Sequence, residues 1–282
     1  MIPAAFDYAA PTTVEEALAA LAAAGEDAKV LGGGQSLLPV LRMRLNAPDA
    51  VIDLGRIEGL RGIREDGDHL VIGAMTTHAE IAASDLVREH AAVLAEAVAT
   101  VADPQVRHRG TIGGALVHAD PAGDYGAPIR ALDADLVIAG PDGTRTVAAA
   151  EFFEDIFATA VQEGEILTEV RIRKHTGWGA AYEKFVRVSH QWSIVAVAAT
   201  VRRDGDRIAE AKIGLTNMGS TPLRASAVEA ALAGVGADGI AAASAAAAQG
   251  TNPPTDLGGD PAYRSHLATV LTRRAVTAAA GL

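Results

Sequence analysis

Two glycine-rich stretches constrain this chain more than any other feature of its sequence. The first is Gly32-Gly33-Gly34-Gln35-Ser36, and the second is Thr111-Ile112-Gly113-Gly114-Ala115. Each adjoins an apolar run, so we predict two exposed loops that leave buried elements. Glycine admits a positive φ and lets main-chain N–H groups approach an anion closely, and the hydroxyls of Ser36 and Thr111 add donors. Together the loops predict a cleft for an extended ligand that carries a diphosphate.

Composition excludes several classes of function. The chain has 24 Lys and Arg residues against 35 Asp and Glu, and this net charge of -11 disfavours nucleic acid as a partner. Cysteine is absent, which excludes disulfides, a thiolate nucleophile and an ordinary iron–sulfur cluster on this chain. No apolar run reaches the roughly 18 residues of a membrane span, and the start lacks a signal-peptide pattern. We therefore expect a soluble, cytoplasmic protein.

Helix and strand signals divide the first part of the chain into two α/β lobes, residues 1–57 and 58–175. In the first lobe, Thr13 and Glu16 form the pattern of a capping box, and Gly25 ends the helix that follows. The other elements expected there are a strand over 28–31, a helix over 37–45 and a strand over 51–54. For the second lobe we expect a helix over 85–98 and strands over 69–73, 136–139, 146–148 and 166–172.

A third part, residues 176–282, has long apolar strands followed by alanine-rich helices. The strands are expected over 180–186, 193–201 and 208–215, and Asp204-Gly205 is typical of a hairpin turn. The helices are expected over 226–233 and 239–249, with a last one capped by Asp260. Strands followed by helices predict a C-terminal α+β domain with an antiparallel sheet, so the whole chain is assigned to the α+β class.

Known sequence fingerprints do not explain the glycines. The chain has no P-loop pattern and no Gly-x-Gly-x-x-Gly that opens a helix, so another solution for dinucleotide binding is needed. The eight histidines show no metal-binding spacing, and no serine lies in a Gly-x-Ser-x-Gly context. We therefore expect no metal site and no catalytic side chain.

The two glycine motifs, followed by His118-Ala119-Asp120-Pro121-Ala122-Gly123-Asp124, resemble the FAD-binding medium subunits of molybdenum hydroxylases. This is the family of the carbon monoxide dehydrogenases and xanthine dehydrogenases, and the likeness spans nearly the whole sequence. It implies a PCMH-type FAD-binding domain built from the two lobes. One departure is Ala115, where relatives frequently have Asn, which leaves only main-chain contact at that position.

The resemblance also implies site residues. Residues 32–36 would line the FAD diphosphate, residues 111–115 would contact the remaining phosphate and ribityl side, and Asp124 would hydrogen-bond the ribityl or flavin region. The implied FAD-binding residues are Gly32, Gly33, Gly34, Gln35, Ser36, Val101, Thr111, Ile112, Gly113, Gly114, Ala115, Asp124, Leu167 and Lys184.

Alternatives stay open for some of these residues. An exposed strand lysine in a salt bridge would explain Lys184 equally well, and plain core packing would explain Val101 and Leu167. His118 lies beside the acidic motif and is a minor candidate for a cofactor contact. Trp192 fits a buried strand position better than a flavin cover.

The family likeness further implies the partners. Substrate oxidation would take place at a molybdenum cofactor on a large subunit, and two 2Fe-2S clusters on a small subunit would relay electrons to FAD on this chain, in a dimer of heterotrimers. The substrate could be carbon monoxide, an aldehyde or an N-heterocycle. Two other functions remain open, a non-catalytic nucleotide-binding scaffold subunit and a standalone FAD oxidoreductase.

Overall fold

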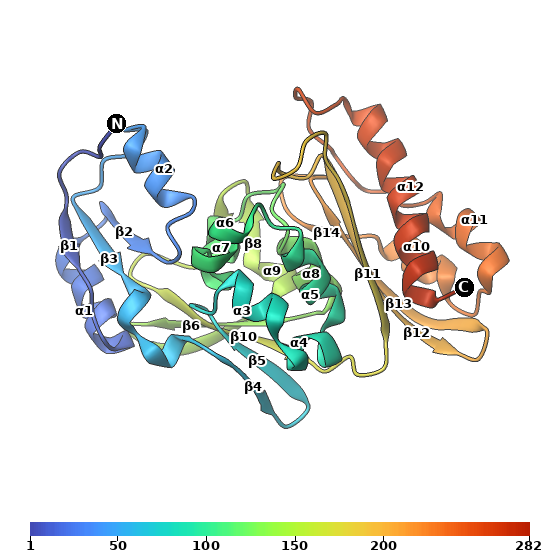
Figure 1. The fold of residues 1–282 in the computed structure, drawn as a ribbon, viewed down its shortest axis with the longest axis horizontal. Helices are drawn as coiled ribbons and strands as arrows, with labels where there is room; N and C mark the ends of the chain where they lie inside the picture. Colours follow the sequence, from blue (N-terminus) through green and yellow to red (C-terminus); the bar gives the residue numbers. More distant parts are fainter.

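Three main β-sheets follow one another along the chain, each with its own helices, in the computed structural model, which describes residues 1–282. Figure 1 shows them side by side, from the blue N-terminal sheet through the central sheet, whose strands run from teal to yellow-green, to the C-terminal part, which runs from gold to red. The core is divided accordingly into three clusters of buried apolar side chains. The largest cluster belongs to the central sheet.

The first sheet is parallel and has the strand order β1-β3-β2. Its elements are β1 (Asp7–Ala9), α1 (Val14–Ala24), β2 (Ala28–Leu31), α2 (Leu37–Arg42) and β3 (Ala50–Asp53), and the short turns η1 (Leu54–Arg56) and η2 (Glu58–Leu60) follow. Half of the expected capping box of α1 is present, because the Thr13 hydroxyl accepts a hydrogen bond from the Glu16 N–H. The Glu16 carboxylate accepts from the Thr12 N–H instead of the Thr13 N–H. The expected helix over 37–45 is shorter, since Arg44 takes a left-handed conformation with φ of 57°.

The central sheet is antiparallel throughout, with the order β4-β5-β10-β6-β7. Its strands are β4 (Ile63–Asp66), β5 (His69–Gly73), β6 (Asp135–Gly140), β7 (Gly143–Ala148) and β10 (Ile166–Arg173). The helices of this part are α3 (His78–Ala83), α4 (Asp85–His90), α5 (Ala92–Ala99), α6 (Pro104–Arg109), α7 (Ile112–His118), α8 (Gly126–Ala131) and α9 (Ala149–Phe152). A small hairpin of β8 (Phe153–Asp155) and β9 (Ala158–Thr159) completes it.

The helix expected over 85–98 is interrupted at Ala91, where φ is −149°. The interruption frees the His90 carbonyl, which accepts a hydrogen bond from the His175 N–H at 2.8 Å. Ser84, rather than Asp85, is the N-cap of the first half, because its hydroxyl accepts from the Val87 N–H. A contact distant in sequence therefore overrides the local helix signal.

The C-terminal part is an antiparallel sheet of order β11-β12-β13-β14, covered by helices. Its elements are β11 (Gly179–Phe185), β12 (Val195–Asp204), β13 (Arg207–Thr216), β14 (Leu223–Arg224), α10 (Ser226–Leu232), η3 (Ala237–Gly239), α11 (Ile240–Ser244) and α12 (Pro261–Ala280). The helix expected over 239–249 ends early at Ser244, whereas α12 has the expected Asp260 cap. None of the helices combines the length and the apolar character that a membrane crossing requires.

The C-terminal sheet packs closely on the central part. Gly214 of β13 lies directly against the main chain of Ala127 in α8, and a side chain at this position would have no room. The Asp133 carboxylate pairs with Lys212 at 2.8 Å and with Arg224 at 2.5 Å, which links the two parts again. These contacts fix β13 and β14 of the C-terminal sheet relative to α8 and the turn after it.

Candidate functional site

The two glycine motifs touch each other in the fold. A Cβ on Gly33 would lie 2.5 Å from the Cα of Gly110 and closer still to the Arg109 carbonyl, and a Cβ on Gly32 would lie 3.1 Å from the Thr111 hydroxyl oxygen. Gly33 therefore has no room for a side chain because the protein's own main chain fills that space. The contact brings the two motifs together, and their use as one binding site between two lobes stays a prediction.

The first motif presents a row of free main-chain donors. None of the N–H groups of residues 32–36 donates a hydrogen bond to another group of the chain. Ser36 precedes α2 as its N-cap residue, but its side chain makes no capping hydrogen bond. Gly34 turns the chain with φ of 76°. Consecutive free N–H groups in such a turn form a concave site for an anion, so residues 32–36 fit a phosphate group.

The second motif has a different arrangement from the exposed loop that we expected. It forms the start of α7, with Ile112 and Gly113 buried. The Ile112 N–H donates to the Thr76 carbonyl at 3.1 Å, the Gly113 N–H to the Ala74 carbonyl at 2.8 Å and the Gly114 N–H to the Thr111 hydroxyl at 3.2 Å.

The Ala115 N–H donates to the Thr111 carbonyl, so only the Thr111 N–H remains free in residues 111–115. Donors for an anion therefore come mainly from the first motif. The second motif supplies the wall behind the first, and its Gly114 is exposed to solvent.

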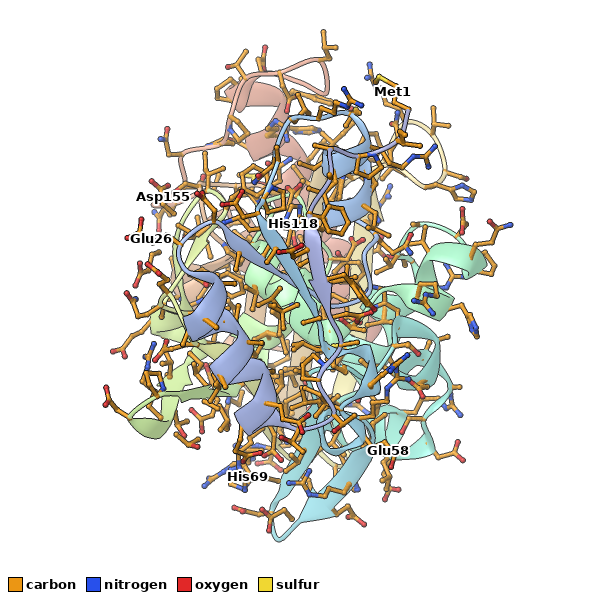
Figure 2. All side chains as sticks on the ribbon, turned by 90° about the vertical axis from the view of Figure 1, so that its left-hand side faces the viewer. Met1, Glu26, Glu58, His69, His118 and Asp155 are labelled. Atoms are coloured by element: carbon orange, nitrogen blue, oxygen red, sulfur yellow. The ribbon has the colours of Figure 1, made fainter.

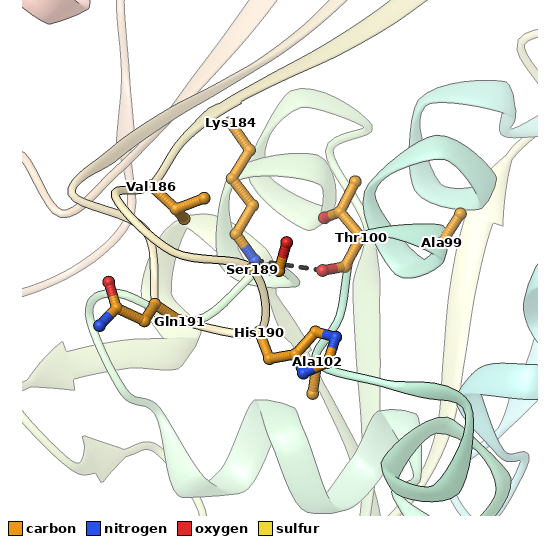
Figure 3. Close-up of a pocket in the computed structure, with 8 residues that line it drawn as sticks. All are labelled: Ala99, Thr100, Ala102, Lys184, Val186, Ser189, His190 and Gln191. Atoms are coloured by element: carbon orange, nitrogen blue, oxygen red, sulfur yellow. Dashed lines mark hydrogen bonds between the residues drawn. The ribbon is translucent and has the colours of Figure 1, made fainter.

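A cavity of about 310 Å³ lies where α5 and the turn after it meet the C-terminal sheet. It is lined by Ala99, Thr100, Ala102, Lys184, Val186, Ser189, His190 and Gln191. Figure 3 shows the Lys184 side chain reaching from β11 to the Thr100 carbonyl, with the His190 ring beside Ala102. The volume is at the lower end of the range of small-molecule sites, and both parts of the chain build its wall.

Helix α6 connects the cavity to the glycine motifs. Ala102, which lines the cavity, lies two residues before α6, and Arg109, whose carbonyl packs on Gly33, is its last residue. Six helical residues rise about 9 Å. Residues 32–36 and the cavity therefore lie near opposite ends of one short helix.

Asp124 and Lys184 form a buried ion pair at the back of this cavity. The Lys184 Nζ lies 2.7 Å from Asp124 Oδ2, and the two side chains are 9% and 3% exposed. The Asp124 Oδ1 accepts hydrogen bonds from the Tyr182 hydroxyl at 2.7 Å and the Ser193 hydroxyl at 3.1 Å. Lys184 is thus in a salt bridge, as one of our two interpretations expected, but it is buried rather than exposed.

A second buried pair lies next to Asp124. The His78 Nδ1 is 2.6 Å from the Tyr125 hydroxyl, and a Cβ on Gly110 would lie 2.5 Å from the His78 Nε2. Burial, with a smaller contribution from the charge of Arg107, lowers the pKa of His78 to about 4. The ring is therefore neutral at pH 7, and the pair supports the Arg109–Gly110 turn without adding charge to the site.

Other candidate residues lie in the core or away from the cavity. Leu167 is a buried member of the largest core cluster, and Val101 packs against that cluster. The His118 ring lies against Phe157, with ring centroids 5.1 Å apart. In Figure 2, His118 lies near the middle of the view from the side of the first sheet, whereas Asp155 lies toward one edge.

The expectation of a buried Trp192 is wrong, because this residue precedes β12 and is 55% exposed.

Sequence reasoning did not identify Tyr182 and Ser193 as part of the site. Tyr182 lies two residues before Lys184 on β11, so the alternation of a strand places both side chains on one face. That spacing is the one signal that could have identified Tyr182. Ser193 lies outside the strands, and its place beside Asp124 depends on the fold of the loop before β12.

Comparison with known proteins gives two family matches that together cover most of the chain. Residues 4–174 match the FAD binding domain in molybdopterin dehydrogenase, and residues 180–279 match the CO dehydrogenase flavoprotein C-terminal domain. Asp124 therefore belongs to the first matched domain, whereas Tyr182, Lys184 and Ser193 belong to the second.

Two relatives and one solved structure are similar to the chain over almost its whole length. The carbon monoxide dehydrogenase medium chain of Hydrogenophaga pseudoflava is 41% identical, over 99% of this chain and 98% of the relative. The medium chain of Afipia carboxidovorans is 40% identical, over 98% and 97%. A chain of the Hydrogenophaga pseudoflava carbon monoxide dehydrogenase structure matches with a TM-score of 0.95 and 43% identity, over 99% of this chain and 98% of that one.

Proposed function

The chain belongs to the family of FAD-binding medium subunits of molybdenum hydroxylases, and we propose that it is the electron-transfer subunit of such a complex. In this role it takes electrons from iron–sulfur clusters of a partner subunit and passes them to an external acceptor. The chain has no cysteine, which is consistent with clusters held by a partner.

The observation that carries this proposal is the row of free N–H groups at residues 32–36, one short helix away from a cavity. Residues 32–36 would hold the diphosphate of FAD, and the cavity beside Lys184 would hold its ring system. The protein surface between these two places, formed by residues 111–115 and Asp124, would hold the ribityl chain. Val101 and Leu167 would pack behind this surface, on its core side.

When bound, FAD supplies the storage of one or two electrons. The chain's own residues orient the cofactor and set its environment. The Lys184 ammonium lies at the cavity wall, where it would stabilise negative charge on a reduced ring, and no side chain would need to act as acid or base.

For the complex we propose a large subunit with the molybdenum cofactor and a small subunit with two 2Fe-2S clusters, in a dimer of heterotrimers located in the cytoplasm. Family membership supports this assembly. The large subunit would select the substrate, which belongs to the class of carbon monoxide, aldehydes or N-heterocycles.

Purification of the native complex through a tag on this chain tests the proposal. We expect a large and a small subunit to copurify, together with molybdenum, iron and FAD. A substrate of one of the three classes should bleach the flavin band of the complex under anaerobic conditions, whereas the isolated FAD-loaded chain should stay oxidised. If the chain purifies without partner subunits and oxidises a donor by itself, the result would instead support a standalone oxidoreductase. If a complex is obtained that contains no flavin, the result would support a scaffold subunit.

A further inference from the structure

The Asp124 carboxylate divides its two oxygens between two kinds of partner. Oδ1 accepts hydrogen bonds from two neutral hydroxyls, those of Tyr182 and Ser193, whereas Oδ2 faces the Lys184 ammonium alone. The carboxylate is almost completely buried. Because hydrogen bonds to a buried charged group are strong, the two hydroxyls fix the orientation of the carboxylate.

The fixed carboxylate in turn fixes the ammonium. Nζ of Lys184 lies 2.7 Å from Asp124 Oδ2 and 3.3 Å from the Thr100 carbonyl oxygen. An ammonium has three N–H donors, so these two contacts leave one donor, and Lys184 lines the cavity. The cation is thereby held at the cavity wall (Figure 3).

Both hydroxyls come from rigid positions. The main-chain N–H of Tyr182 donates to the Glu96 carboxylate at 2.9 Å, and burial together with the Asp124 charge raises the pKa of the phenol, so it stays a donor. Ser193 is 2% exposed, and its carbonyl accepts from the Asn217 side chain at 2.9 Å. Such outer contacts commonly orient the groups that face a cofactor.

We propose that Tyr182 and Ser193 are positioning residues which, through Asp124, hold the Lys184 ammonium against the cavity and so raise the reduction potential of the FAD bound there. This inference rests on the proposed function. Without the hydroxyl of Tyr182, Oδ1 loses its closer donor, and the carboxylate can turn both oxygens toward the ammonium. The cation then moves away from the cavity, and a reduced, anionic ring loses stabilisation.

The test compares Tyr182→Phe with Ser244→Ala in the full-length, FAD-loaded chain. Ser244 is the control, because its hydroxyl is also buried and hydrogen-bonded, but it donates to the Ile240 carbonyl within α11 and does not line the cavity. At a fixed potential, we expect Tyr182→Phe to lower the ratio of reduced to oxidised flavin about threefold, as for a modest loss of charge stabilisation. Ser244→Ala should leave the ratio unchanged.

A double variant identifies the route of the effect. If Tyr182 acts through Asp124, then adding Tyr182→Phe to Asp124→Asn should leave the flavin ratio at the value of Asp124→Asn alone. The inference is overturned if Tyr182→Phe does not shift the ratio, if Ser244→Ala shifts it equally, or if the shift persists in the Asp124→Asn background. A wild-type chain that takes up no FAD would instead contradict the proposed function itself.

Discussion

Replacement of Gly33 by Val is expected to weaken FAD binding by at least about 100-fold, roughly 3 kcal/mol. A Cβ at this position would lie 2.5 Å from the Cα of Gly110 and would overlap the Arg109 carbonyl. Main chain cannot move aside as a flexible side chain can, so the two glycine motifs must separate. The free N–H groups of residues 32–36 would then lose their common geometry. Titration of the apoprotein with FAD measures the effect.

Gly59→Val is the matched control for this variant. Gly59 is exposed, has no positive φ and has no atom within 4 Å of a built Cβ, so the valine finds open space. Gly114→Val should have a smaller effect than Gly33→Val, since its closest contact is the Thr111 hydroxyl oxygen at 3.0 Å. Unchanged FAD affinity in Gly33→Val, with Gly59→Val also unchanged, would show that the contact between the motifs does not shape the site.

Asp124→Asn is expected to lower the free energy of unfolding by about 3–5 kcal/mol, because it leaves the buried Lys184 cation without its partner. Asparagine keeps the shape of the side chain and can still accept from Tyr182 and Ser193. The loss therefore reports on charge rather than on packing. Urea unfolding of the apoprotein measures it.

Adding Lys184→Met to Asp124→Asn should restore most of the lost free energy of unfolding. Replacing both charges by neutral groups of similar volume removes the unpaired cation, and such replacements are often close to neutral. The single and double variants thus form a double-mutant cycle. A single variant that costs less than about 1 kcal/mol, or strictly additive effects in the cycle, would show that the pair contributes little.

The order of elements could be predicted because their signals are local. The Asp260 cap before α12 and the turn after Asp204 are read from neighbouring residues, and the structure confirms both. The helix break at Ala91 could not be predicted in this way, since it depends on a hydrogen bond from His175 to the His90 carbonyl. Such a partner becomes known only when β10 has its place in the sheet.

The candidate site likewise combines local features, which the sequence indicates, with contacts between distant segments, which it does not. The glycine spacing indicated two motifs that meet, but it could not show that the amides of Ile112 and Gly113 are already used by the turn after β5. Nor could it show that the partners of Asp124 come from the C-terminal domain, because Tyr182 and Ser193 reach it only through interdomain packing. Composition and spacing describe one chain segment at a time, whereas these contacts join segments about 60 residues apart.

We propose above all that residues 32–36 bind the diphosphate of a flavin dinucleotide whose ring lies in the cavity beside Lys184. The most direct test is a calorimetric titration of the full-length apoprotein with FAD and, separately, with FMN, which lacks the diphosphate bridge and the adenosine. We predict one FAD per chain and an affinity for FMN at least about 100-fold weaker, a difference of roughly 3 kcal/mol. Absence of FAD binding, or equal affinity for FMN and FAD, would contradict the claim.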